Sequence, residues 1–372
     1  MKSQRGLTLV ELMIALVLSS IVVYAGISMF LASRGTASTT AAVGAVTDSG
    51  RVALDFIADS VRTSGAMQCN AVNNSAAPSG VSLTNIITNS AGLALNYAEA
   101  MDGFEAAGTG VGGTDTVAAT PISADSAGTD WSTSAGAPLD ALLSDRVVQG
   151  SDVIAVRESI PSSAPAYLPM GSSYATGTGQ VTLTVANVQS LQPLQYAVIS
   201  NCAYATVFQI HNVNPMTEQI TTDGPLDTGG PAPGDLGQSF VQGAVINAVD
   251  MTAYFIAPGR DTDSALYSYD EWTGQFEQLV PDVENMQVLY GIASGTPGQV
   301  GSYVTADHVP DFNSVVSVQV ALLVASPPGM RAVAQPAVAQ TYNLLGTTVT
   351  APIDARLRRV FVTTIAVENA AD

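Results

Sequence analysis

The sequence predicts an α+β fold in which one long N-terminal helix packs on an antiparallel β-sheet, with a large loop-rich insert between them. Residues 7–65 carry first the apolar and then the amphipathic pattern of a continuous helix. From residue 146 onward, short β-branched runs are separated by clusters of Gly and Pro, which is typical of strands and turns. The connections between these runs lack helical periodicity, so we expect neighbouring strands to be antiparallel.

Composition excludes several classes of function. The 372 residues include 12 basic and 31 acidic side chains, which gives a formal net charge of −19. That sign repels phosphate backbones, so we expect no nucleic-acid partner. Lys2 is the only lysine of the sequence. A P-loop or a Schiff-base lysine is therefore excluded beyond the N-terminus.

The first apolar stretch is long enough to cross a membrane. From Leu7 to Ala32 it holds one charged side chain, Glu11, and it exceeds the roughly 20 residues that span the hydrocarbon layer as a helix. Lys2 and Arg5 precede it without an intervening acid. The positive-inside rule then keeps the start of the chain in the cytoplasm and sends the remainder across the membrane.

Glu11 needs an explanation, because a charge in lipid is costly. A secretory signal cut after Ala25 is one interpretation, but apolar side chains continue through Leu31, beyond the place where such a signal ends. An ordinary anchor is the second, in which Glu11 lies about 6 Å below the interface and reaches toward water. The third is cleavage between Gly6 and Leu7, and we favour it because it accounts for the acid.

Cleavage at that bond leaves a cationic α-amino group on Leu7 at nearly the membrane depth of the Glu11 carboxylate. Between helices staggered along a filament, the carboxylate of one subunit can neutralise the amine of its neighbour. An unpaired charge in lipid costs a few kcal/mol or more. The pairing would therefore favour subunits that enter the polymer in a fixed register.

The stretch RGLTLVELMIAL, residues 5–16, resembles the cleavage and methylation segment of type IV pilins and pseudopilins, in which a short basic leader ends in glycine and glutamate is the fifth residue after it. The resemblance implies that prepilin peptidase cuts after Gly6, that Leu7 is N-methylated, and that Glu11 guides assembly. Leu7 stands where phenylalanine is usual. The proline common midway along the helix of major subunits is absent, which indicates a subunit other than the principal one.

The sequence divides into five segments along the chain. They are a removed cytoplasmic leader at 1–6, a transmembrane or filament-core helix at 7–32, its amphipathic continuation at 33–65, a loop-rich variable insert at 66–145, and a β-rich periplasmic or extracellular body at 146–372. Gly65 is the expected stop of the helix. The apolar stripe of the amphipathic segment consists of Ala42, Val46, Ala53, Ile57 and Val61.

Seven runs in the body have strand patterns. They are residues 151–158, 181–185, 204–210, 245–257, 283–293, 315–326 and 358–369. The stretch ALYSYDEWTGQFEQLV, residues 265–280, predicts a hairpin with its turn around Thr273 and Gly274.

Several segments of the body also resemble a subfamily, the PilW-like minor pilins. The segments are SDVIAVR, ALYSYDEWTGQFEQLVPDVENMQVLYGI, VVSVQVALLVAS and the closing RRVFVTTIAVEN. The resemblance implies a pilin fold, with the long helix laid on the antiparallel sheet, and a minor subunit of a type IV pilus. It leaves residues 70–145 uncovered.

Cys69 and Cys202 are the only cysteines of the sequence. An even number of cysteines in an exported chain favours a disulfide, because disulfides persist outside the cytoplasm. In the chain-entropy model a bridge closing so long a loop stabilises the fold by about 4 to 5 kcal/mol. The alternative is two unpaired, buried thiols.

Neither catalysis nor cofactor binding has a supporting motif. His211 and His308 are the only histidines, and no hydrolase or zinc-ligand spacing accompanies them. The stretch GTGVGGTD, residues 108–115, lacks the strand and helix that flank a dinucleotide loop. We therefore predict no enzyme activity, catalytic residue, metal, cofactor or small-molecule substrate.

An acidic loop between residues 261 and 271 leaves calcium as an open alternative. Its acids are Asp261, Asp263, Asp270 and Glu271. The EF-hand pattern fails there, because Ala265 and Leu266 occupy the places of the third ligand and the turn glycine. Solvated hairpin acids are the simpler interpretation.

The resemblances imply a minor pilin that takes part in pilus assembly, in a priming or tip complex, with other minor pilins, the major pilin and prepilin peptidase as partners. Before assembly it would sit in the inner membrane with a periplasmic body, and afterwards in the pilus at the cell surface. A pseudopilin of a type II secretion system is the alternative that would use the same cleavage and the same apolar helix. From another class, an exported soluble adhesin or hydrolase requires conventional cleavage after Ala25.

Overall fold

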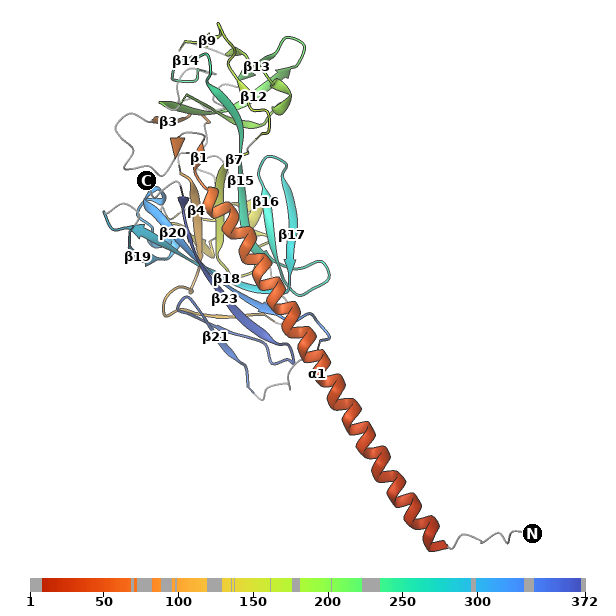
Figure 1. Ribbon diagram of the computed structural model, residues 1–372. Helices are drawn as coiled ribbons and strands as arrows, with labels where there is room; N and C mark the ends of the chain where they lie inside the picture. Colours follow the sequence, from red (N-terminus) through yellow and green to blue (C-terminus); the bar gives the residue numbers. More distant parts are fainter. Residues whose placement is uncertain are drawn as a thin grey trace, which may run out of the picture.

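The computed structural model confirms the α+β fold (Figure 1). One long helix runs along a body of antiparallel sheets, and its N-terminal half projects away from that body. The structure describes residues 9–67, 70–71, 82–87, 96–97, 99–118, 129–134, 136, 138–160, 162–175, 181–201, 203–222, 235–295, 299–330 and 338–368.

Helix α1 spans Leu9–Thr63 without a break, over 55 residues. No proline interrupts the sequence of this helix, so every turn can keep its backbone hydrogen bonds. It ends at Thr63, two residues before the predicted stop Gly65, whose φ of 72° lies in the left-handed region that glycine adopts readily. The N–H of Gly65 donates to the carbonyl of Arg157 at 2.9 Å, which ties the end of the helix to strand β7, Val153–Ile160.

The second half of α1 buries the predicted stripe. All five apolar residues of that stripe are fully buried. The structure adds small residues to them, and the complete buried face consists of Ala42, Val46, Gly50, Ala53, Ile57, Ala58 and Val61. These positions recur every three or four residues, so they share one side of the helix.

The largest sheet among the described residues has the strand order β10-β13-β12-β11-β15-β7-β4-β6. Its path comprises β10 Thr182–Thr184, β13 Gln219–Thr222, β12 Tyr204–Asn214, β11 Tyr196–Ser200, β15 Val245–Ala257, β7, β4 Met101–Ala106 and β6 Trp131–Ser132. The hairpin of β16 Ala265–Asp270 and β17 Gln275–Pro281 extends from β15. In addition, β3 Ser82–Asn85 pairs with β12, and β8 Ala166–Tyr167 pairs with β15. The predicted turn is confirmed, with Gly274 at φ 64°.

Helix α1 packs mainly on a second sheet. Its order is β19-β18-β20-β23, with every pair antiparallel. The strands are β19 Val300–Val304, β18 Val283–Ala293, β20 Val315–Ala325 and β23 Arg358–Ala366. Helix α1 packs chiefly on β23 and β20 and touches β17 and β7 as well, so it spans both sheets.

The main core lies between α1 and these two sheets. Helix residues such as Val46 and Ile57 meet the inward side chains of the sheets in one continuous apolar cluster. Its fully buried strand members include Ile154, Ile256, Leu266, Met286, Val318, Val320 and Leu322. Asp152 helps to join the sheets, because its carboxylate accepts from the N–H of Ala106 at 3.0 Å and from the N–H of Val288 at 2.8 Å.

A distal lobe lies beyond the C-terminal end of α1 (Figure 1). It combines β10 to β13 and β3 with the small pair β9 Ser173–Tyr174 and β14 Phe240–Val241. The lobe has its own apolar cluster, which includes Leu183, Phe208, Ile220 and Phe240. Because β15 is long, it places Ile256 in the main core and Ile246 in the cluster of this lobe, and so connects the two clusters.

Short elements complete the described structure. They are β1 Ala66–Met67, β2 Asn70–Ala71, β5 Thr114–Thr116, β21 Thr341–Leu344, β22 Thr347–Thr350, the single-turn helix α2 Ala141–Ser144, and three 3-10 turns at Val188–Ser190, Ala306–His308 and Phe312–Ser314. Strand β5 pairs with β22, and β3 with β12, in parallel. These two parallel pairs depart from the expected antiparallel pattern, and both involve strands of the 66–145 segment.

The 66–145 segment is more than loops. Strand β4 is almost entirely buried and pairs with β7 inside the largest sheet. Trp131 is buried as well, and its indole Nε1 donates to the carbonyl of Ser151 at 2.8 Å. This part of the segment belongs to the core of the body, which the Gly-rich composition did not indicate.

The body buries an unusual set of carboxyl groups. Burial, and then the neighbouring Asp102, raise the pKa of Glu99 to about 8. Burial and Asp270 raise the pKa of Asp250 to about 8, and burial raises the pKa of Glu105 to about 7. The fully buried Asp152 also has a raised pKa. These groups therefore favour their protonated, uncharged form in the folded chain.

The close approach of β23 to the helix generates the first prediction. A Cβ on Gly50 would overlap the ring of Phe361, whereas a Cβ on Gly44, also in the helix, would meet open space. We expect Gly44→Ala to stabilise the fold by roughly 0.5 to 1 kcal/mol, because alanine favours the helix. Gly50→Ala should instead destabilise it, by about 1 to 3 kcal/mol, because the ring must shift.

The measurement is thermal unfolding of the full chain in detergent, followed by circular dichroism. The paired glycines serve as each other's control. Equal shifts of the same sign would show that Phe361 does not pack on the helix at Gly50.

The buried carboxyls generate the second prediction. Their pKa values in the folded chain exceed the unfolded values of about 4. Between about pH 4 and pH 8 the folded chain therefore holds protons that the unfolded chain has released, and the free energy of unfolding falls as the pH rises. We expect the unfolding temperature to drop steadily from pH 5 to pH 8.

Asp250→Asn tests the cause of that drop. In the parent chain the N–H groups of Met251 and Trp272 donate to Oδ1 of Asp250. The side-chain amide of asparagine keeps an oxygen that can accept both bonds, and it does not titrate. The variant should lose part of the pH dependence. A flat or rising profile in the parent chain would contradict the assignment.

Candidate assembly segment and buried ion-pair network

The predicted processing residues can be placed only in part. Gly6 and Leu7 lie outside the described residues, as do Cys69 and Cys202, so the cleavage site and the disulfide stay predictions. Glu11 lies in the first turn of α1. The partial positive charge at a helix N-terminus favours a carboxylate in this position.

The first half of α1 presents an uncovered apolar surface. Large apolar side chains from Leu9 to Leu31 are between 54% and 77% exposed. The helix has an 18-residue window with a mean hydropathy of 2.3, and none of that window is buried against the body. Length and composition therefore suffice for a membrane span, and a surface of this size requires lipid or other helices around it.

Three serine hydroxyl groups in this half are satisfied within the helix. Ser19 Oγ donates to the carbonyl of Leu16 at 3.0 Å, and Ser20 Oγ donates to that of Val17 at 2.8 Å. Ser28 Oγ does the same to the carbonyl of Ala25 at 2.9 Å. Serines bonded in this way add little desolvation cost in an apolar surround. Glu11 is thus the one charged side chain that such a surround must accommodate in this half of the helix.

The other candidate residues do not assemble into a site. Among the described residues no group of three His, Cys, Asp or Glu side chains is placed to hold a metal ion. The exposed His308 pairs locally with Asp307 at 2.8 Å. Asp270 accepts from the backbone N–H of Thr273 at 2.8 Å and so caps the hairpin turn. Asp270 therefore has a structural role in the hairpin.

Asp263, another acid of the 261–271 loop, belongs to a network that the sequence did not reveal. Two arginines just before and at the start of β23 meet three acids from distant parts of the chain and one acid nearby. The participants are Arg356, Arg358, Asp263, Asp282, Glu284 and Asp354. Their contacts join the β15–β16 loop, the β17–β18 corner and the segment that leads into β23.

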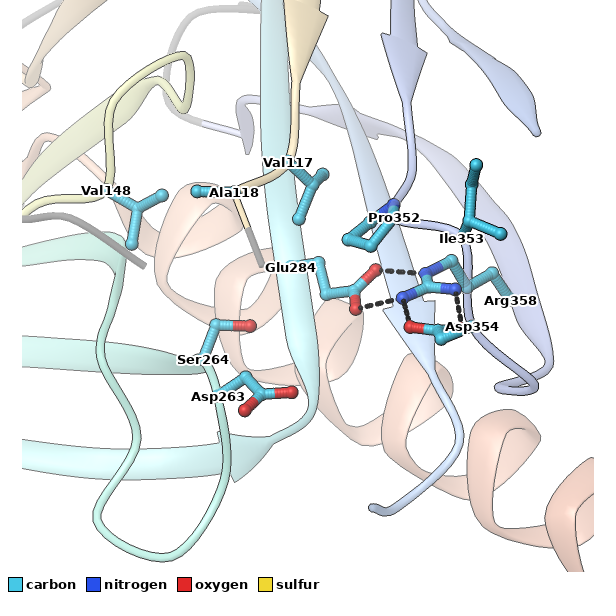
Figure 2. A pocket seen from close by; sticks show the side chains of 10 residues that line it. All are labelled: Val117, Ala118, Val148, Asp263, Ser264, Glu284, Pro352, Ile353, Asp354 and Arg358. Carbon is cyan, nitrogen blue, oxygen red and sulfur yellow. Dashed lines mark hydrogen bonds and ion pairs between the residues drawn. The ribbon is translucent and has the colours of Figure 1, made fainter. Parts of the chain in front are cut away.

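Arg358 is the centre of the network (Figure 2). Its Nε donates to Glu284 Oε2 at 2.6 Å and its Nη2 to Glu284 Oε1 at 3.0 Å. Nη1 and Nη2 also donate to the two carboxylate oxygens of Asp354, each at 2.7 Å. Such two-pronged contacts are the strongest that a guanidinium forms. Although burial opposes it, the hydrogen bonds from Arg358 lower the pKa of Asp354, and the acids raise that of Arg358.

Arg356 holds the adjoining corner of the chain. Its Nη2 donates to Asp282 at 2.7 Å, its Nη1 to Asp263 at 2.8 Å, and its Nε to the carbonyl of Ser326 at 2.7 Å. Asp282 has a φ of 63°, unusual for a residue other than glycine. Burial raises the pKa of this carboxyl, although Arg356 opposes the shift. The arginine therefore fixes the tight corner where β17 turns into β18.

A cavity of about 250 Å³ opens beside this network. Figure 2 shows that its lining combines apolar side chains with the acids and with Arg358. The residues are Val117, Ala118, Val148, Asp263, Ser264, Glu284, Pro352, Ile353, Asp354 and Arg358.

Comparisons with known proteins agree with both ends of the chain. Residues 253–369 match the family model described as Type IV Pilus-assembly protein W, and residues 1–23 match the model described as Prokaryotic N-terminal methylation motif. Among solved structures, the type IV-like pilin TTHA1219 from Thermus thermophilus is 16% identical, and the match covers 49% of this chain and 87% of that chain with a TM-score of 0.19. No curated protein sequence matches the chain.

The two matched regions coincide with the two features described above. Residues 1–23 include the start of the exposed apolar helix with Glu11, and residues 253–369 run from the end of β15 through β23 and contain the ion-pair network. The chain is therefore similar to the type IV pilus-assembly protein W family over residues 253–369, and it carries the prokaryotic N-terminal methylation motif at residues 1–23.

Proposed function

We propose that this chain is a minor subunit that starts or caps type IV pilus polymerisation after cleavage at Gly6 and methylation of Leu7. The observation that carries the proposal is the first half of α1, an uncovered apolar cylinder with one acid in its first turn. An apolar surface of this kind is stable in the inner membrane or among the helices of a filament. The second half fixes this cylinder to the body.

The role of Glu11 follows from the cost of its charge. In an apolar surround a carboxylate requires a cation close by. Cleavage after Gly6 creates one, because the new α-amino group of Leu7 is positively charged near neutral pH. In an assembly, the amine of an adjacent subunit can meet Glu11, and this pairing would set the register between the helices.

The alternatives differ in their first residue or in their partners. A pseudopilin of a type II secretion system would share the processing and the helix, and would assemble with secretion components instead of pilus subunits. An exported soluble adhesin or hydrolase would lose the apolar helix through cleavage after Ala25. We propose the pilus role because residues 253–369 match the pilus-assembly family.

The mature N-terminus gives the third prediction. Intact-mass and N-terminal peptide analysis of the chain, purified from a host that expresses prepilin peptidase, should show a first residue Leu7 with one added methyl group. A catalytically inactive peptidase provides the control. With it, the bond after Gly6 should stay uncut and the leader should remain attached. A chain that begins after Ala25 would contradict the proposal and favour the soluble alternative.

Glu11→Ala gives the fourth prediction. The variant should insert in the membrane at the parent level, because the helix becomes more apolar. It should be lost from sheared pili, and the number of surface pili should fall by about tenfold, in proportion to the loss of one buried charge pair. Immunoblots of membrane and pilus fractions, with electron microscopy of the cells, measure both effects.

Ser19→Ala is the matched control, since it removes a polar group from the same helix face of the membrane half without changing charge. It should leave pilus number unchanged. Normal piliation with Glu11→Ala would overturn the assigned role of the acid.

A further inference from the structure

We propose that the cavity beside Arg358 is a receptor for a lysine side chain of another protein. The cavity has an acidic side, formed by Asp263 and Glu284 with the hydroxyl of Ser264 between them, and an apolar wall (Figure 2). A lysine combines an ammonium group with a four-carbon stem, so both parts of the cavity have a counterpart in the ligand.

The acids around the cavity outnumber the cations. Four carboxylates contact two guanidinium groups within the network. Every nitrogen of the Arg358 guanidinium already donates to Glu284 or Asp354. The arginines therefore stabilise the acids without neutralising all of them. An entering cation would compensate the remaining negative charge.

Ser264 supplies an independent observation. Its side chain is only 3% exposed, and its Oγ is buried without a hydrogen-bond partner. Figure 2 shows that this hydroxyl points into the space between Asp263 and Glu284. Buried hydroxyl groups are nearly always bonded. A donor that enters the cavity, such as an ammonium N–H, would satisfy the oxygen of Ser264.

The mouth of the cavity is suited to entry from outside. The side chain of Asp263 is 50% exposed, and only its Oδ2 is bonded to Arg356. Ile353 is 50% exposed at the rim. Together with Pro352, Val117 and Val148 it provides apolar surface along which an alkyl stem can lie.

A calcium ion fits less well than an organic cation. Calcium takes six to eight oxygen ligands. Here the carboxylate oxygens of Glu284 and Asp354 are engaged by Arg358, and the described residues contain no cluster of three metal-ligating acids or histidines. Apolar side chains occupy much of the wall where calcium would need oxygen.

The donor of the lysine must be a different protein. Lys2 is the only lysine of this sequence, and it lies in the leader whose removal we propose. A second copy of the processed chain therefore has no lysine to insert. That the donor is another pilus subunit rests on the proposed function, whereas binding of an alkylammonium ion does not.

n-Butylammonium chloride, which reproduces the lysine side chain, tests the proposal on the full chain in detergent micelles. Methyl-labelled NMR should show saturable shifts of Val117, Val148 and Ile353, with a Kd on the order of 1 to 10 mM, as expected for one small ligand. n-Butanol at the same concentrations should cause no saturable shift. Calcium chloride should not displace the amine.

Two variants locate the binding site, and a third is the control. Asp263→Asn and Ser264→Ala should each weaken binding by about tenfold, the effect of losing a hydrogen bond to a charged group. Asp261→Asn makes the same charge change in the same loop outside the cavity and should bind as the parent does. Absence of saturable shifts, equal binding by all variants, or tighter binding of calcium at these methyl groups would each overturn the proposal. Any of these results can occur with normal processing at Gly6, so the pilus role is judged separately.

Discussion

The contact between the second half of α1 and strands β20 and β23 is the interaction on which the rest of the structure depends. It buries a narrow face of small and β-branched residues, with Gly50 placed directly under the ring of Phe361. Because this half is held by the body and the first half is not, one continuous helix has two environments. The body thereby fixes the direction in which the apolar half points, without touching it.

Much of this arrangement could be predicted from the sequence, because it depends on local periodicity. The helical stripe from Ala42 to Val61, the strands at 245–257 and 283–293, and the turn at Gly274 follow from spacing alone. Strand β4 could not be predicted in this way. Its sequence MDGFEA holds two acids and a glycine, and it is buried because Gly103 leaves room for the side chain of Tyr290 and because Asp152 caps its end.

The ion-pair network escaped prediction for a related reason. Arg356 and Arg358 meet Asp263, Asp282 and Glu284, residues that lie 74 to 93 positions earlier in the chain. Opposite charges at such separations form no recognisable sequence pattern, because only the fold brings them together. A usable signal was present all the same: basic residues directly before a strongly apolar strand are rarely left unpaired when that strand is buried on one face.

The internal use of arginine also shapes the outer surface of the body. Arg157 is buried against Asp102, and Arg356 and Arg358 are held by the network. The guanidinium of Arg146 rests on the ring of Phe276, 4.0 Å from its centre. With Arg157, Arg356 and Arg358 engaged inside the fold, and with a net charge of −19 on the whole chain, the electrostatic field at the surface of the body is negative. Long-range attraction then favours partners with basic surfaces. At the cavity beside Arg358 this preference is concentrated at a place that a single side chain can enter.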